Sequence, residues 1–162
     1  MNLYDLLVAK KLSGGGGGGG GSDYYYQAVV RNDQTVGFLR LTFGEAAEEI
    51  PTGLFQWNGN IGEIIIGDAT KVLRDDCLKQ MSGVEKIEIG SGVTRIGSQA
   101  FYSDSKLKTI IIHATTPPTL TDSTAFDSIA SDYVVYVPSE SLATYQRTSN
   151  WSSIRTHMQA IP

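Results

Sequence analysis

Two glutamates, Glu63 and Glu88, stand at alternate positions of short apolar segments and are the acidic residues whose placement could do chemistry together. A pair of carboxylates across one groove is the arrangement that glycoside hydrolysis requires. Such a pair would make the chain a carbohydrate-active enzyme. Neither glutamate has further catalytic groups near it in the sequence, so we expect a non-catalytic protein and keep the enzyme as an alternative.

The other reactive side chains are scattered. Asp75 and Asp76 are adjacent but have no acid–base partner at a recognisable spacing. The chain has two histidines, His113 and His157, and one cysteine, Cys77, so no metal-ligating cluster is expected. We therefore expect no catalytic residues, no metal and no cofactor, and a single cysteine allows no disulfide within the chain.

Four segments share one apolar pattern and begin at residues 36, 61, 84 and 107. They are Val36–Leu41, Ile61–Ile66, Val84–Ile89 and Leu107–Ile112. Their starts lie 25, 23 and 23 residues apart. Self-similarity at such a period is typical of a solenoid, in which each unit buries its apolar face only by stacking on the next.

Two more sets of apolar positions repeat with these segments. The first set is Ile50, Leu73, Ile96 and Leu120. The second consists of the pairs Leu54–Phe55, Cys77–Leu78, Ala100–Phe101 and Ala125–Phe126. Because Cys77 occupies a column otherwise held by leucine and alanine, we interpret it as a small buried hydrophobic residue.

Alternation within each unit predicts a strand. In the third unit, apolar Ile87 and Ile89 alternate with charged Lys86 and Glu88, which indicates one buried and one open face. Strands one repeat apart must run parallel. The second half of that unit, residues 96–101, is too short for a long helix and predicts a turn of helix or a short strand on the opposite side.

The third unit, residues 84–106, resembles the BspA-like leucine-rich repeat family, with a strand followed by Gly92–Gly97 and then Ala100–Phe101. The fourth resembles the variant found near the end of such arrays, through residues 116–120. The resemblance covers residues 36–162. It implies a β-rich α/β solenoid with parallel strands, about four repeats and a cap at each end. The first unit departs from it through the acidic residues 45–49 and the pair Ile50–Pro51.

Both ends of the array carry residues suited to capping. At the C-terminal end, Ser139 is a candidate helix N-cap, and Leu142 and Tyr145 share a helical face. Trp151, Ile154, Met158 and Ile161 recur at helical spacing, and we expect them to close the core. At the N-terminal end, residues 23–36 predict a strand or hairpin, although the three consecutive tyrosines 24–26 could instead form a contact surface.

Composition limits the classes of partner. Lys and Arg total 13 and Asp and Glu total 17, which gives a formal net charge of −4 and a pI near 5.1. Nucleic acid is therefore not an expected partner, because phosphate binding needs a clustered basic face. No apolar run approaches the roughly 20 residues of a transmembrane helix, and residues 1–12 do not fit a signal peptide.

Eight consecutive glycines, residues 14–21, predict a flexible linker over residues 13–22. The preceding residues 1–12 place Leu3, Leu6 and Leu7 at helical spacing, so we interpret them as a docking peptide, with an inconsequential start as the alternative. The segment Tyr4–Leu12 with its glycines resembles the N-termini of structural proteins of phages and prophages of gut bacteria. That resemblance implies an anchor peptide (residues 1–12) that binds other virion proteins, with a leucine-rich repeat domain (residues 23–162) displayed outward.

The alternating open positions of the strands form two columns that we expect on a concave face. The first is Arg40, Ile65, Glu88, Ile111 and Tyr136. The second is Phe38, Glu63, Lys86, Thr109 and Val134. Solenoids use such faces for binding, although β-branched residues also simply suit strands.

Together, the two resemblances imply a non-catalytic, virion-associated tail or fibre protein that binds a bacterial surface protein or glycan. A bacterial cell-surface adhesion protein of the BspA-like type, located on the cell surface instead of the virion, is the main alternative, and a purely structural decoration protein is another. A homo-oligomer, such as a fibre trimer, is compatible with the virion hypothesis.

Overall fold

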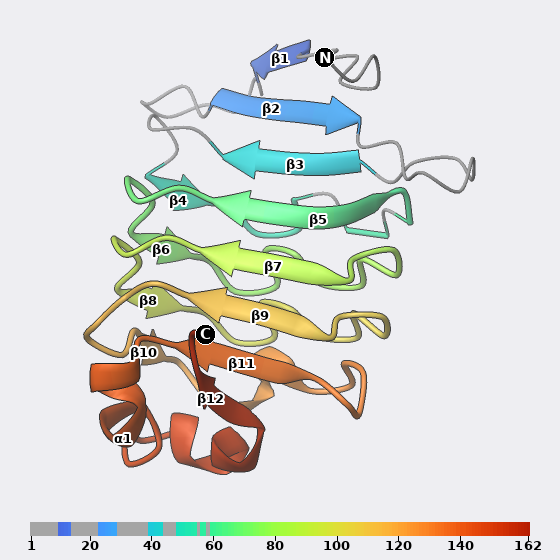
Figure 1. Ribbon diagram of the computed structural model, residues 1–162. Helices are drawn as coiled ribbons and strands as arrows, with labels where there is room; N and C mark the ends of the chain where they lie inside the picture. The colour runs from blue at the N-terminus through green and yellow to red at the C-terminus, as the bar shows by residue number, and fades with distance from the viewer. Residues whose placement is uncertain (1–9, 14–22, 29–38, 44–47, 55, 58) are drawn as a thin grey trace.

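The computed structural model describes residues 10–13, 23–28, 39–43, 48–54, 56–57 and 59–162. Successive coils of the chain stack with their strands side by side, which confirms the predicted solenoid (Figure 1). Among the described residues, none of the helices combines the length and apolar character needed to cross a membrane.

A long sheet of eight strands, in the order β1-β2-β3-β5-β7-β9-β11-β12, forms one side of every coil. The strands are β1 (Lys10–Ser13), β2 (Asp23–Ala28), β3 (Leu39–Phe43), β5 (Ile61–Ile66), β7 (Lys86–Ile89), β9 (Thr109–Ile112), β11 (Val134–Val137) and β12 (Met158–Ala160). Neighbours from β3 to β12 run parallel, as predicted, because each strand is followed by a return segment.

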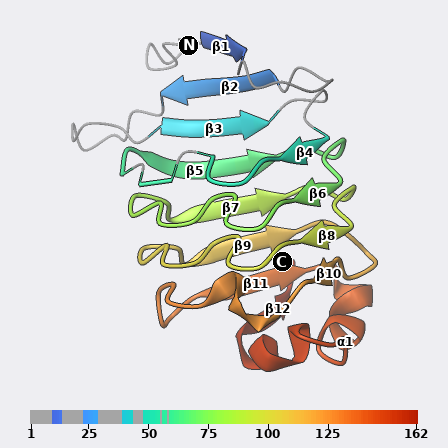
Figure 2. The same ribbon diagram turned by 180° about the vertical axis from the view of Figure 1, so that it is seen from behind.

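A second sheet of four two-residue strands lies on the opposite side of the coils (Figure 2). Its strands are β4 (Glu49–Ile50), β6 (Val72–Leu73), β8 (Arg95–Ile96) and β10 (Thr119–Leu120). They pair in parallel and bring Ile50, Leu73, Ile96 and Leu120 into one row. The short-strand interpretation of the second half-repeat is therefore confirmed.

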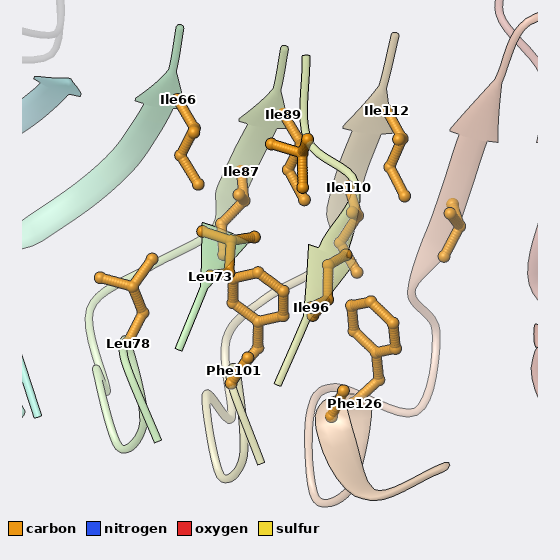
Figure 3. Close-up of a cluster of buried hydrophobic side chains, with 14 of the residues drawn as sticks. Ile66, Leu73, Leu78, Ile87, Ile89, Ile96, Phe101, Ile110, Ile112 and Phe126 are labelled. Atoms are coloured by element: carbon orange, nitrogen blue, oxygen red, sulfur yellow. The ribbon is translucent and has the colours of Figure 1, made fainter. Parts of the chain in front are cut away.

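The core lies between the two sheets and the return turns (Figure 3). Isoleucines from the long sheet, such as Ile87 and Ile110, face Leu73 and Ile96 from the short one. Phe101 fills the third side and stacks on the next aromatic ring of its column, with ring centroids 5.4 Å apart. All of these side chains are fully buried, so each apolar column of the sequence is a wall of the core.

The C-terminal cap closes the core with two fully buried aromatic residues, as predicted. Trp151 Nε1 donates a hydrogen bond of 2.7 Å to the Pro118 carbonyl, and Tyr145 Oη donates one of 2.8 Å to the Ala114 carbonyl. The cap contains 3₁₀ helices at Ser139–Ser141 and Trp151–His157 and the short helix α1 (Leu142–Tyr145); another 3₁₀ turn, Ser123–Phe126, precedes β11. Because both polar ring atoms are satisfied, the rings can be buried without an unpaired donor.

Two details predicted for this cap are wrong. Ser139 lies inside a 3₁₀ turn and donates its hydroxyl to Glu140 Oε2 at 3.2 Å instead of capping a helix. The helical spacing does not continue to Met158, because residues 158–160 form β12, in which Met158 pairs with Val135 of β11. Pairing with the sheet supplies the backbone hydrogen bonds that a further helical turn would have made, and it also buries Met158.

The N-terminal end corrects a further prediction. Of residues 23–36, for which a strand or hairpin was expected, residues 23–28 form the strand β2, which pairs antiparallel with β3. Residues 29–36 lie outside the described residues. Residues 10–12, however, belong to the strand β1 paired with β2, instead of to a helix that spans residues 1–12. The anchor residues Leu3, Leu6 and Leu7, and the glycines between β1 and β2, lie outside the described residues.

Candidate functional site

The outer face of the long sheet carries the two predicted columns, with one correction. Ile65, Glu88, Ile111 and Tyr136 pair across β5, β7, β9 and β11. Glu63, Lys86, Thr109 and Val134 form the neighbouring column. Apart from Glu63, which is buried, every residue of these two rows is half-buried, as expected for an open sheet face.

The correction concerns β3. Arg40 pairs with Glu63 and not with Ile65, whose partner is Thr42, so Arg40 belongs to the second column. Phe38, which was placed there, lies outside the described residues. The register shifts by one residue between Leu39 and Arg40, and from Arg40 onward the strand follows the same 23-residue offset as the later coils. The apolar segments alone suggested an offset of 25 residues between the first two units, because Val36 was matched to Ile61 at the start of β5.

Two ion pairs and a hydrogen bond join β5, β7 and the residue that follows β9 on this face. Lys86 Nζ lies 3.0 Å from Glu63 Oε1 and 3.5 Å from Glu88 Oε2. The other oxygen of Glu88 lies 2.8 Å from His113 Nε2. His113 was not predicted to have a partner, yet it follows Ile111 by two residues and so shares the outer face with Glu88.

These contacts keep the face charged near neutral pH. The hydrogen bond with Glu63 raises the pKa of Lys86, and the hydrogen bond with His113 lowers the pKa of Glu88. Glu63 is only 7% exposed, so it forms the floor beneath the Lys86 amine. The face therefore presents fixed charges beside the half-buried aliphatic side chains of Ile65 and Ile111.

A pocket of about 660 Å³ opens where β5, β7 and β9 begin. Its polar lining consists of Glu63, Glu85, Lys86, Ser105, Lys106, Lys108 and Thr109. Three of these residues were predicted from the strand columns. Ser105, Lys106 and Lys108 were missed because they precede β9, where no alternation identifies the open side.

Trp57 was also not identified from the sequence as a candidate surface residue. Its side chain is 72% exposed, and it is the exposed large hydrophobic residue of the described part of the chain. It lies in the turn before β5 with a left-handed backbone, φ 69°. Trp57 lies in a turn, outside the apolar positions that repeat along the sequence. Only the structure therefore shows that its side chain is not part of the core.

Asp75 and Asp76, which are adjacent in the sequence, each make contacts within the repeat domain. Asp75 Oδ1 accepts the Ser98 backbone N–H at 3.0 Å, and Asp76 pairs with Lys79 at 2.9 Å. Within the described ranges no cluster of His, Cys, Asp and Glu could hold a metal ion.

Cys77 is fully buried in its core column, and burial raises the pKa of its thiol far above the usual range. We expect the native protein to show no reaction with a thiol reagent such as dithionitrobenzoate over hours at pH 8, because the nucleophilic thiolate is neither formed nor accessible. In denaturing guanidinium chloride, one thiol per chain should react at once. Prompt reaction of the native protein would contradict the buried position.

Parallel strands stacked once per 23-residue coil, with short strands opposite them and an open outer face, define a leucine-rich repeat solenoid. A family model of a BspA type leucine rich repeat region, of six copies, matches residues 35–153. The chain belongs to this family. No curated protein is significantly similar to it in sequence. Repeats of this type indicate a surface-binding or adhesion protein.

Proposed function

We propose that this protein is a non-catalytic component of a phage or prophage particle, in the tail or a fibre, and that its repeat domain binds a bacterial surface. The observation that carries the binding role is the outer face of the long sheet, where Ile65 and Ile111 lie beside the charges of Lys86 and Glu88. Alternating apolar and charged groups on a rigid sheet suit recognition of a partner more than simple solvation.

The non-catalytic assignment is supported by the state of the two glutamates. The pKa of Glu88 is lowered by its hydrogen bond with His113, whereas a general acid needs a raised pKa. Glu63 is held beneath the Lys86 amine at 3.0 Å. Both carboxylates thus act as partners of cations on this face.

The virion setting is supported by the sequence of residues 1–22, which resembles the N-termini of structural proteins of phages and prophages. In this setting, the anchor peptide of residues 1–12, whose last three residues pair with β2, joins the protein to other virion proteins. The second candidate is an adhesion protein on the bacterial cell surface, which is favoured by the family match over residues 35–153.

Immunogold electron microscopy of an induced culture lysate, with antibody to the repeat domain, separates the two candidates. We expect gold on tails or fibres of the particles and none on cell envelopes. Gold on envelopes with bare particles would discard the virion proposal in favour of the adhesion protein. As a separate check of binding, the purified full chain should sediment with host cells, and a chain that stays in the supernatant would contradict the binding role in both settings.

A further inference from the structure

The turns that precede β5, β7 and β9 stack on one another along one edge of the solenoid (Figure 1). Trp57, Gln80 and Ser103 hold equivalent places, 23 residues apart, and all three have left-handed backbones with φ between 61° and 69°. Successive turns are joined by hydrogen bonds, such as that from Gln56 Nε2 to Gln80 Oε1 at 2.8 Å. These hydrogen bonds join the described residues of neighbouring turns along this edge.

The turn itself does not require a tryptophan. Glutamine and serine hold the same left-handed position in the next two coils, so the backbone geometry accepts small or polar side chains. Trp57 nevertheless leaves a large indole 72% exposed to water. A large indole held at the surface, apolar on its faces and polar at its N–H, offers contact area to a ligand or partner.

The pocket of about 660 Å³ lies on the same edge. The turn that holds Trp57 leads directly into β5, whose Gly62 and Glu63 line the pocket, while Ser105 and Lys106 come from the equivalent turn two coils on. The aromatic residue and the pocket are thus carried by one stack of turns.

The pocket lining holds three lysines and two glutamates, Glu63 and Glu85. Lys86 is paired with Glu63, which leaves two lysines that can accept a new partner. Lys106 makes no ion pair with any residue that the structure describes. Lys108 pairs with Asp132 at 2.8 Å, but both side chains are more than half exposed, 60% and 63%. An exposed pair of this kind contributes little to stability, so Lys108 can readily exchange it for a bound anion.

We propose that this edge binds an acidic carbohydrate, a pyranose chain that bears carboxylates. The apolar face of one sugar ring stacks on the Trp57 indole, and a carboxylate of the chain meets Lys106 and Lys108, beside the hydroxyl groups of Ser105 and Thr109. Charge-assisted hydrogen bonds to the lysines select the acidic sugar, and the indole supplies contact area that is independent of charge. The inference rests on the proposed function, for which it names the class of surface ligand.

Isothermal titration of the full chain with hexagalacturonate, and with neutral maltohexaose as the comparison, tests the proposal. We expect hexagalacturonate to bind at least tenfold more tightly, with affinity that falls as NaCl is raised because the charged part of the contact is screened. Trp57→Gln should lose at least tenfold in affinity for hexagalacturonate; glutamine is the residue that the next coil carries at this place. Lys106→Gln should bind hexagalacturonate several-fold more weakly, and its affinity should depend much less on the NaCl concentration. Arg155→Gln, which removes an exposed positive charge from the C-terminal cap, is the matched control and should bind as the wild type does.

Equal affinity for the two sugars, or an unchanged affinity of Trp57→Gln, would overturn the proposal. Binding of host cells by the full chain without binding of either sugar would overturn it while leaving the proposed function intact. Loss of cell binding after protease treatment of the cells would point to a protein receptor and also overturn it. Absence of any cell binding would instead count against the proposed function.

Discussion

Replacement of Gly92 by alanine is expected to lower the free energy of unfolding by at least about 3 kcal/mol, the upper end of the range for overpacked sites. A Cβ atom at this position would lie 1.7 Å from the backbone oxygen of Asp68, in the turn of the preceding coil. Real contacts of this kind do not fall below about 3 Å, so two coils would have to separate. The clash is with the backbone of Asp68, which cannot move aside as the end of a flexible side chain can.

Gly59→Ala provides a matched control for this substitution. The nearest atom to a Cβ at Gly59 is the hydroxyl oxygen of exposed Ser82, at 3.3 Å, which can move aside. We expect its free energy of unfolding, measured in urea, to stay within about 0.5 kcal/mol of the wild type, the usual range for surface substitutions. Equal midpoints for the Gly92 and Gly59 variants would show that the coils are not stacked as closely as the structure has them.

Between about pH 4.5 and 8 the stability of the protein is expected to fall as pH rises, because of Asp104. This carboxyl group is fully buried, Oδ1 accepts the Met81 N–H at 2.7 Å, and Oδ2 has no hydrogen-bond partner in the described part of the protein. Burial raises the pKa of Asp104 to about 8, against an ordinary value of 3.8.

The sign of the effect follows from proton binding. Between the two pKa values the native state holds a proton that the unfolded state has released, so each unit of rising pH costs roughly 1.4 kcal/mol of stability. The loss is complete once pH passes the native pKa. Below about pH 4 the trend reverses, because the pKa values of Glu88 and Asp68 are lowered in the native state and their stabilisation is lost on protonation.

Asp104→Asn isolates this contribution. The asparagine keeps an acceptor for the Met81 N–H but cannot ionise, so urea unfolding of the variant should show little pH dependence from pH 5 to 8 and exceed the wild type in stability at pH 8. Asp127→Asn, at an exposed position, should retain the wild-type slope. A wild-type stability that is flat or rising across this window would mean that Asp104 is ionised in the native state.

Most of the fold could be predicted from the sequence because the coils stack in a single row and repeat at a nearly constant spacing in the chain. Each coil contacts mainly its neighbours, so a 23-residue spacing such as that from Leu73 to Ile96 fixes which residues stack, and these two do pair in the short sheet. The same logic placed Glu63, Lys86 and Thr109 in one row of the long sheet. It failed at the ends, at Met158 and at residues 10–12, because a terminal segment has no equivalent in the next coil.

The sequence by itself determined the family, the parallel stack and the two rows of residues on the open face, since periodic burial of apolar side chains is written directly into the residue order. Only the tertiary structure decided that Arg40 pairs with Glu63, that Asp104 is a buried carboxyl, and that Trp57 stands exposed on the edge that carries the lysine-lined pocket. Each of these depends on turn geometry and on contacts between coils. Turns obey no repeating pattern of hydrophobicity, so the placement of their side chains emerges only when the coils are packed together.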